Sequence, residues 1–440
     1  MILSRLAALI VFSLALAACG NLGRAPTPSA TSAVASPTIL APTPASPTAV
    51  APTESPPPTC SLAYSDGGGS LFCWLDDGTS RLISAGAGLG HPRLSPDGTL
   101  VAYTLTDGLG SQLWVVNADG RGQPHALAAQ DDLPSEDAAL IYSPLNFAWR
   151  AGTHTLVFDT NWYGVGGVPG PGERLNADLW RVEADRRSVT QLLPNGEAGR
   201  FSLSPDGRFA AISRVTGIDL LNLDSADLRR DLITFPALTT YSEYAYRPSV
   251  TWSPNSQSFS VAVPSPDPLA PDANVVLYRV RVDGQVQVLG ALVGNFVFGD
   301  TIPVEFSPDG QYVVGGQTQP DHSPALYLAK ADGTNIVTLD QRNPLQGWGW
   351  APDSQRYAYT VGGEGGDGEG LVVNADAEGS TEVFLFGLNA MRWLRWRDSH
   401  SVLLHAQVNG RWGLWYLALG GVPQLLVDEL GPEAQADLRP

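Results

Sequence analysis

Lysine is almost absent from this chain of 440 residues, where Lys330 is the only one. The 26 basic residues are outnumbered by 44 acidic residues, so the formal net charge is −18 at pH 7. An acidic surface of this kind repels the phosphates of nucleic acids, and the sequence lacks the basic patch that such binding requires. We therefore expect no nucleic-acid partner and little chemistry that relies on lysine.

Catalytic motifs are missing as well. The chain has no G-x-S-x-G nucleophile elbow, no H-E-x-x-H motif and no P-loop. A single G-x-G-x-x-G match at Gly363, Gly365 and Gly368 lies between two expected strands and does not open a helix, which argues against a dinucleotide site. We interpret it as a solvated loop, with Ca²⁺ binding by its acidic residues as the alternative. The six histidines lack ligand-like spacing, so we expect no metal and no cofactor.

Only three cysteines occur, and the first lies at the end of an N-terminal leader. MILSR is a short basic start, and the apolar run after it is too short to span a bilayer comfortably. The sequence Leu16-Ala17-Ala18-Cys19 resembles a bacterial lipobox. The resemblance implies that residues 1–18 are a lipoprotein signal peptide and that Cys19 carries the lipid. A plain secretory signal with an incidental cysteine is the alternative.

Residues 19–59 are expected to form a stalk. From Arg24 to Thr59 the chain consists almost entirely of Pro, Thr, Ser and Ala. Such a segment cannot bury a core, and its prolines favour extended conformations. We predict a disordered linker that ties the rest of the chain to a membrane of the cell envelope, on its extracytoplasmic side.

The other two cysteines, Cys60 and Cys73, flank the turn SDGGGS almost symmetrically. Strand pairing about this turn would place them opposite each other, at a distance that a disulfide can span. A disulfide also fits an oxidising, extracytoplasmic location. Two unpaired cysteines are the alternative.

One short turn recurs through the rest of the chain: LSPDG at Leu94, LSPDG at Leu203, WSPNS at Trp252, FSPDG at Phe306 and WAPDS at Trp350. Proline presets the first corner of a type I turn, Asp or Asn tolerates the second, and Gly or Ser follows. An apolar stretch comes after each copy, so each predicts a strand, a tight turn and a second strand. Two weaker copies begin at Trp149 and Trp396, and the spacing of 44 to 55 residues is typical of a β-propeller.

A second repeat lies within the first. After each hairpin comes a strand closed by an Asp-containing turn, as in LWVVNADG from Leu113, and then another short strand. Each repeat thus supplies four strands, a to d, and forms one blade. The first module, from Ser61 to Ser84, lacks an a strand, which Glu433 to Pro440 would supply if the chain ends share a blade. We expect an all-β propeller of four-stranded blades, with eight blades preferred and seven as the alternative.

The aromatic or Leu residue before S-P-D-G, followed by an apolar strand and an L-Y-x-x-x-x-D-G-type strand, resembles the TolB-like β-propeller repeat family. The resemblance covers about Thr59 to Pro440 and implies a single propeller over residues 60–440. The same repeats occur in the propeller domains of prolyl oligopeptidase-type peptidases, whose nucleophile elbow this chain lacks. Function is implied only weakly, because propellers host binding proteins, scaffolds and enzymes.

Loop length points to a working face. Because strands alternate in direction, the a–b and c–d turns lie on one face, and the b–c and d–a connections, which contain every long insertion, lie on the other. Long loops on a rigid scaffold tend to carry function, and exposed aromatic side chains suit protein, peptide or glycan contacts. Rings folded over the channel mouth as lids are the alternative. The candidate binding residues are Tyr142, Trp162, Tyr163, Tyr241, Tyr244 and Tyr246.

Three functions fit these features. The first is a membrane-tethered, extracytoplasmic binding or scaffold propeller that engages a protein or a cell-envelope polymer through the long-loop face. The second is an extracytoplasmic enzyme, a glycan lyase or hydrolase, with its site at the channel mouth. The third is a structural or sensory subunit of an envelope complex. Since no catalytic residue is identified, we favour the first and expect no enzymatic activity.

Overall fold

The computed structural model describes residues 59–107, 110–133, 140–164, 178–240, 245–296, 303–319, 323–342, 345–361, 368–374 and 381–439. These ranges belong to one compact unit. Within them, no helix has the length and apolar character needed to cross a membrane. The predicted signal peptide, Cys19 and the stalk before residue 59 lie outside the described residues.

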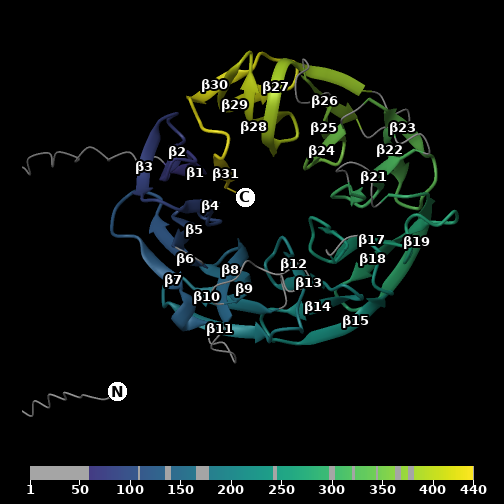
Figure 1. The fold of residues 1–440 in the computed structure, drawn as a ribbon, viewed down its shortest axis with the longest axis horizontal. Coiled ribbons are helices and arrows are strands. Elements are labelled where there is room, and N and C mark those ends of the chain that lie inside the picture. The colour runs from purple at the N-terminus through teal and green to yellow at the C-terminus, as the bar shows by residue number, and fades with distance from the viewer. Residues whose placement is uncertain are drawn as a thin grey trace, which may run out of the picture. The chain divides into compact units, whose positions relative to one another are not determined.

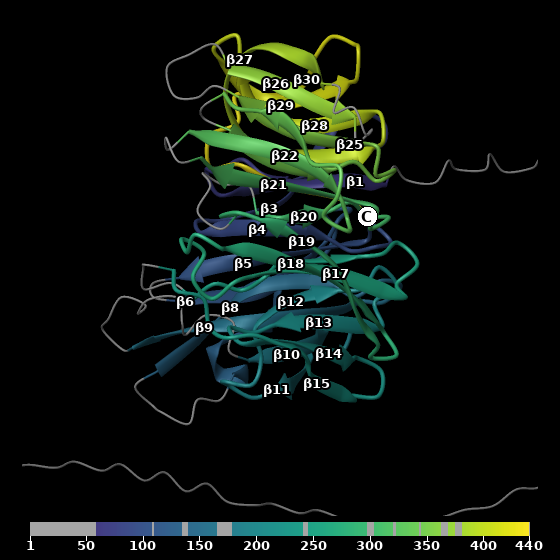
Figure 2. The same cartoon turned by 90° about the vertical axis from the view of Figure 1, so that its right-hand side faces the viewer.

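The strands form a ring of sheets around a common centre (Figure 1), and Figure 2 shows the same sheets from the side. The first sheet contains β1 (Cys60–Ser65), β2 (Ser70–Leu75), β3 (Ser80–Ala85) and β31 (Gln435–Leu438). The second contains β4 (Leu89–Leu94), β5 (Leu100–Asp107), β6 (Gly110–Asn117) and β7 (His125–Ala128). The third follows the 3-10 helix η1 (Gln130–Asp132) and contains β8 (Leu140–Trp149), β9 (Thr155–Gly164), β10 (Leu179–Glu183) and β11 (Ser188–Leu193).

The remaining sheets continue the ring in chain order. The fourth contains β12 (Arg200–Leu203), β13 (Phe209–Ser213), β14 (Gly217–Asn222) and β15 (Leu228–Thr234). The fifth contains β16 (Val250–Trp252), β17 (Ser258–Pro264), β18 (Asn274–Arg281) and β19 (Val286–Val293). The sixth contains β20 (Glu305–Phe306), β21 (Tyr312–Thr318), β22 (Pro324–Lys330) and β23 (Val337–Asp340). The seventh contains β24 (Leu345–Trp350), β25 (Arg356–Val361), β26 (Gly368–Asn374), β27 (Thr381–Asp398), β28 (Ser401–Val408), β29 (Arg411–Ala418) and β30 (Gln424–Asp428).

The ring has seven blades, and not the eight that we preferred. Six sheets have four strands each, and the seventh has seven. The difference arises at β27, which is 18 residues long. Its first part pairs with β26 as far as Leu388, and its second part pairs with β28 from Leu388 to Asp398. Because the d strand of one repeat continues unbroken into the a strand of the next, the last two repeats form one hydrogen-bonded sheet.

The recurrent turn is explained by hydrogen bonds that only this sequence pattern supplies. In the copy at Ser95, the backbone N–H of Gly98 donates to the Ser95 carbonyl at 2.8 Å, and the Ser95 hydroxyl donates to Asp97 Oδ1 at 2.7 Å. The same carboxylate oxygen accepts the backbone N–H of Thr99. Gly98 has φ +75°, which explains the glycine at the end of the motif, and Ser256 takes the same left-handed conformation in its own copy.

Tryptophan anchors link neighbouring repeats through the backbone. The indole N–H of Trp149 donates to the carbonyl of Arg93 in the preceding sheet at 2.9 Å, and that of Trp252 donates to Ser202 at 3.0 Å. Trp350 and Trp396 make the equivalent hydrogen bonds to Glu305 and Gly349. These tryptophans are therefore structural.

The hydrophobic core is a series of clusters, most of which lie between neighbouring sheets. Leu113 of the second sheet, for example, belongs to one cluster with Phe158 of the third, and Leu277 of the fifth belongs to another with Phe306 of the sixth. Further clusters join the first sheet to the second and the seventh sheet to the first. The apolar b and c strands thus bury their side chains by stacking blade on blade.

The C-terminal strand closes the ring, as the sequence predicts. β31 is the innermost strand of the first sheet and pairs antiparallel with β1, with Ala63 opposite Asp437. It also contacts the second sheet, because Asp437 Oδ2 accepts the backbone N–H of Leu94 at 2.9 Å. The two ends of the described chain are therefore held in one sheet.

The predicted disulfide joins Cys60 and Cys73, with their Cα atoms 5.6 Å apart. The two residues are not directly opposite each other, as symmetric pairing about the turn would require. Cys60 lies opposite Leu75 and Cys73 lies opposite Ala63, because the two strands pair in a register that places Ser65 opposite Leu71. A bulge between Cys60 and Leu62 then shifts this register by one residue.

Removal of residues 433–440 tests the closure. We expect the free energy of unfolding to fall by more than the roughly 3 kcal/mol that uncovering the small apolar side chains of this strand would cost, because an open ring also exposes the edges of β1 and the core between the first and seventh sheets. Chemical denaturation of the truncated and full chains measures this difference. Equal unfolding midpoints would contradict closure by β31.

Candidate functional site

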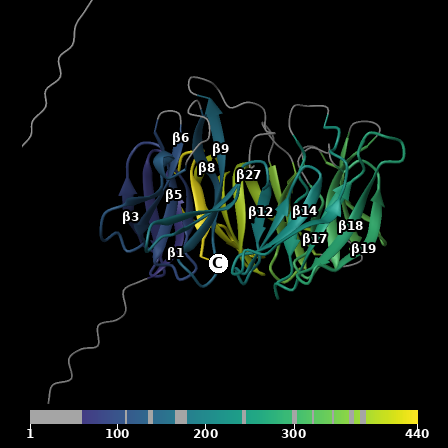
Figure 3. The ribbon, with the colours of Figure 1, turned by 90° about the horizontal axis from the view of Figure 1, so that it is seen from below.

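The two faces of the ring differ in the length of their connections. All the strand pairs are antiparallel, so the a–b and c–d turns share one face, which we call the short-turn face, and the other connections share the long-loop face. The longest connection on the short-turn face is 118–124. The predicted asymmetry is therefore present, and Figure 3 shows the two faces from the side. The long-loop face carries 129–139, 165–178, 235–249, 265–273 and 294–304.

Three of the predicted aromatic residues lie on the hairpin formed by β8 and β9. Tyr142 is directly opposite Trp162, and Ile141 is opposite Tyr163. The Tyr142 ring is half-buried against the core between the second and third sheets, and its hydroxyl accepts a hydrogen bond from Asn195 Nδ2 at 3.3 Å. The Tyr142 side chain is therefore partly packed against the core and partly exposed. The side chains of Trp162 and Tyr163 lie outside what the structure describes.

The other three aromatic residues precede β16. Tyr246 is half-buried, and this burial raises the pKa of its hydroxyl to about 12. Tyr241 and Tyr244 lie outside the described residues. The two candidate side chains that can be seen, Tyr142 and Tyr246, thus agree with the alternative in which rings pack back onto the core.

Two buried carboxylates lie in the third sheet. Asp159 accepts hydrogen bonds from the backbone N–H and Nδ2 of Asn146, at 2.8 and 3.1 Å. Asp178 accepts hydrogen bonds from Thr160 and from the indole N–H of Trp180. Burial raises the pKa of both carboxyl groups, that of Asp159 to about 7, although the hydrogen bonds oppose the shift. Since both are fully enclosed, they fix strands and do not face a substrate.

His154 bridges the second and third sheets at the short-turn face. Its Nε2 lies 3.0 Å from Asp97 Oδ2 and 3.4 Å from Thr99 Oγ1, and its Nδ1 lies 3.1 Å from Asp185 Oδ1. The grouping looks like a hydroxyl–imidazole–carboxylate triad, but Asp97 occupies the nitrogen that would accept a proton from Thr99. Burial alone would lower the pKa of His154, yet the two carboxylates outweigh it and the pKa is raised. The imidazole thus links the two sheets through carboxylates that favour its protonated form.

Charged side chains gather on the innermost strands where the ring closes. Arg93 of β4 has its Nη1 3.8 Å from Asp437 Oδ1 of β31. Burial raises the pKa of Asp437 against the effect of Arg93 and Arg395. Burial and the nearby charge of Arg93 lower the pKa of Arg395, which lies on β27, against the effect of Asp437. β31 and β4 lie next to each other near the centre of the ring, and β27 belongs to the adjacent seventh sheet (Figure 1).

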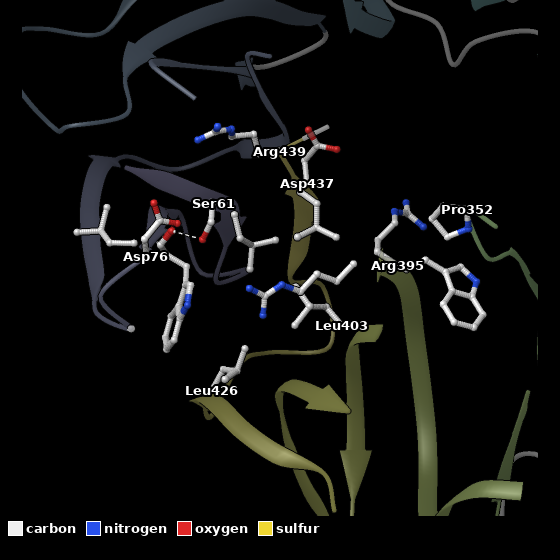
Figure 4. A pocket seen from close by; sticks show the side chains of 15 residues that line it. Ser61, Asp76, Pro352, Arg395, Leu403, Leu426, Asp437 and Arg439 are labelled. Atoms are coloured by element: carbon white, nitrogen blue, oxygen red, sulfur yellow. Dashed lines mark hydrogen bonds between the residues drawn. The ribbon is translucent and has the colours of Figure 1, made fainter. Parts of the chain in front are cut away.

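A cavity of about 880 Å³ lies beside this cluster, between the first and seventh sheets, and we call it the seam cavity. In Figure 4, Ser61 and Asp76 border it from the first sheet, and Arg395 and Leu403 border it from the seventh. Arg397 also lies over the ring of Tyr416, 5.6 Å from its centroid. The charged residues of its lining are Asp76, Arg395, Arg397, Asp437 and Arg439.

The seam cavity is suited to recognising an anionic or polar group. Guanidinium groups keep their protons, so its three arginines can bind and orient a ligand but do not exchange protons with it. Across the described ranges, no group of three or more His, Cys, Asp or Glu side chains is arranged to hold a metal ion.

Sequence reasoning missed the seam cavity, although a pattern was present. Arg93, Arg395 and Asp437 occupy one place in the repeat, immediately before the Leu or Trp anchor of an a strand. Only the closed ring shows that these three charged residues are neighbours. The equivalent residues in the other repeats are Ala148, Ser202, Thr251, Glu305 and Gly349.

Comparison with known proteins supports the fold. No protein-family model matches the chain, and no curated protein matches its sequence. Porphyromonas gingivalis dipeptidyl peptidase 4 superposes with a TM-score of 0.53 at 13% identity, over 77% of this chain and 53% of that one. An oligogalacturonate lyase in complex with manganese gives a TM-score of 0.47 at 14% identity, over 77% and 86%. TolB from Acinetobacter baumannii gives 0.32 at 14% identity, over 64% of each chain.

The structural neighbours thus include TolB and other β-propeller proteins, and this chain is an all-β propeller. At such identities the likeness concerns the fold alone. The chain also spans only about half the length of the dipeptidyl peptidase 4 chain.

The pH dependence of stability tests the His154 link. The pKa of His154 is raised in the folded state above its ordinary value. Its contribution to the free energy of unfolding is therefore complete at a pH below the ordinary pKa and is lost as the pH rises through the folded-state pKa. We expect His154→Gln to lower the unfolding temperature more at pH 5.5 than at pH 8.5. His125, whose pKa is lowered by burial, is the matched control, and His125→Gln should show the opposite trend. An equal effect of His154→Gln at both pH values would contradict the link.

Proposed function

We propose that this protein is a membrane-tethered, extracytoplasmic binding or scaffold propeller that engages a protein or a cell-envelope polymer through its long-loop face. The observation that carries the proposal is the asymmetry of the faces. Each a–b turn is short, whereas the long-loop face carries connections such as 165–178 and 235–249 that no strand pairing requires.

The entry point of the chain supports this orientation. β1 begins at Cys60 on the short-turn face, where the backbone N–H of Asp76 donates to the Thr59 carbonyl at 3.1 Å. A tether that precedes Thr59 therefore joins the propeller on the face opposite to the long loops. Such an arrangement leaves the long-loop face directed away from the attachment point.

The first test concerns the anchor. We expect Cys19→Ser to move the protein from the membrane fraction to the soluble fraction while the propeller stays folded, because lipidation at Cys19 is the proposed means of attachment. Fractionation with immunoblotting measures the distribution. The double variant Cys60→Ser, Cys73→Ser is the control and should remain with the membrane, since it removes the disulfide and keeps the lipid. An unchanged membrane fraction for Cys19→Ser would refute the anchor.

The second test concerns the long-loop face. We expect the quadruple change of Trp162, Tyr163, Tyr241 and Tyr244 to Ala to abolish recovery of the dominant partner in proximity labelling on intact cells. Aromatic anchors at interfaces contribute about 2 kcal/mol or more each, so the joint loss should be plain. Thermal unfolding of the variant separates a lost contact from a lost fold, because rings that act as lids would lower the unfolding temperature.

Asp309→Asn is the matched control on the short-turn face. Asn255 occupies the equivalent turn position and makes the same hydrogen bonds, so this change should preserve both folding and capture. Undiminished capture by a folded quadruple variant would move the contact away from the long-loop face.

A further inference from the structure

The face that the fifth sheet turns toward the sixth is divided into an apolar half and a polar half. Near the long-loop face, Ala262 and Leu277 pack against Phe306 and Val313 of the sixth sheet. Two residues closer to the short-turn face on the same strands, the side chains become Ser260 and Arg279. The change occurs within one interface between neighbouring sheets.

Comparison between repeats shows that this polar half is peculiar to the fifth sheet among its neighbours. A row of residues crosses each sheet from the a strand to the d strand, and its two central members lie on strands b and c. In the fourth sheet these are Ala211 and Leu220, and in the sixth they are Val314 and Leu328. In the fifth sheet the complete row is Thr251, Ser260, Arg279 and Gln287.

A cavity of about 600 Å³ occupies the place of the missing apolar packing, and we call it the polar notch. Its volume lies within the range of about 300–1,000 Å³ that is typical of small-molecule sites. The lining adds Ser253, Asn255 and Ser258 from the fifth sheet and the turn at Asp309 and Gly310 from the sixth. None of the described lining residues is aromatic, which excludes a ligand that is held by stacking.

Arg279 is the only guanidinium of the polar notch without an acidic partner in the described part of the chain. It is half-buried, and its Nη2 donates to the carbonyl of Gly310 at 2.7 Å. The other arginine of the notch, Arg281, pairs with Asp283 at 3.1 Å. Gly310 has φ +67°, and a Cβ atom there would lie 2.8 Å from Arg279 Nη2, so glycine makes room for the guanidinium.

Ser260 adds an independent sign of a ligand. Its side chain is 5% exposed and lines the notch, yet its hydroxyl makes no hydrogen bond to any described residue. The hydroxyl faces the notch and is available to a ligand, and a half-buried cation without a counter-ion costs free energy. Apolar residues occupy the equivalent positions in the fourth and sixth sheets, so the fold itself does not require Ser260 and Arg279.

We propose that the polar notch binds an acidic sugar, that is, a saccharide ring bearing one carboxylate. The carboxylate would pair with the free edge of Arg279, because a planar guanidinium matches a carboxylate with two hydrogen bonds. Hydroxyl groups of the ring would bond to Thr251, Ser260 and Gln287, which both donate and accept. A single negative charge fits better than a phosphate dianion, since Asp309 also lines the notch and the chain carries a net charge of −18.

Calorimetric titration of the full-length protein with D-glucuronate tests the site. D-glucose has the same ring hydroxyls without the carboxylate, and acetate and inorganic phosphate carry the charge without the ring. We expect saturable binding of glucuronate and at least about tenfold weaker binding of each of the other three, since hydrogen bonds to a charged group account for a factor of this size. Absence of saturable glucuronate binding, or equal binding of glucose, would overturn the proposal.

Arg279→Leu introduces a leucine, which is the residue at the equivalent position of the neighbouring sheets, Leu220 and Leu328. We expect glucuronate affinity to fall at least about tenfold and the unfolding temperature to stay the same or rise, because an apolar side chain relieves the unpaired cation. Arg186→Leu removes the same charge at an exposed position and should leave the affinity unchanged. Unchanged affinity in Arg279→Leu would refute the site.

If Arg279→Leu does not fold, Thr251→Val and Gln287→Ala replace it in the titration. Each should weaken glucuronate binding severalfold, and unchanged binding in both would refute the site. The polar notch lies at the short-turn face, so its test is independent of the proposed long-loop contact.

Discussion

Four repeats are tied to the one before them by the tryptophan that anchors their a strand. The indole N–H groups of Trp149 and Trp252 reach the backbone carbonyls of Arg93 and Ser202 in the preceding sheets. Each such contact joins a hydrogen bond of about 1 kcal/mol to the burial of a large ring. Because the acceptor is a backbone carbonyl, the spacing between sheets is fixed while the side chain of the acceptor residue stays free to vary.

That freedom explains how one ring carries different chemistry around its centre. The residues whose carbonyls accept these hydrogen bonds are arginine, serine, glutamate and glycine at Arg93, Ser202, Glu305 and Gly349. The anchor must be a residue that can donate the hydrogen bond, whereas any residue can supply the accepting backbone carbonyl. Charges can therefore accumulate on adjacent inner strands, as Arg93 and Asp437 do at the seam, without disturbing the stacking of sheets.

The two faces separate two kinds of feature. The short turns are fixed internally by Ser–Asp hydrogen bonds, and His154 links two sheets at this face, where β1 also begins. Both the seam cavity and the polar notch open among these turns, at places where the interface between sheets is polar or incomplete. The neighbouring sheets have Leu, Val and Ala at the positions where the polar notch has Ser260 and Arg279. The long-loop face instead varies by insertion, which leaves the stacking untouched.

Much of the architecture follows from local sequence. The S-P-D-G turns, the apolar stretches after them, the Cys60–Cys73 disulfide and the closing strand near the C-terminus predict the propeller and its closure. The number of blades does not follow, because the unbroken hydrogen bonding of β27 depends on its partners on both sides. The candidate aromatic residues were chosen by loop position, but the burial of Tyr142 and Tyr246 depends on the packing of neighbouring strands.

What the sequence by itself determined is therefore the repeating unit: the turn, the four strands, the anchor and the order of the blades. What only the tertiary structure decided is which residues become neighbours when the ring closes. Arg93 and Asp437 are separated by almost the whole propeller along the chain, yet their side chains lie 3.8 Å apart. The physical reason is that the period of a repeat is a local property of the chain, whereas closure of the ring brings its two ends together. In the same way, the polar notch at Arg279 is recognised only by comparison with the packing of the neighbouring sheets.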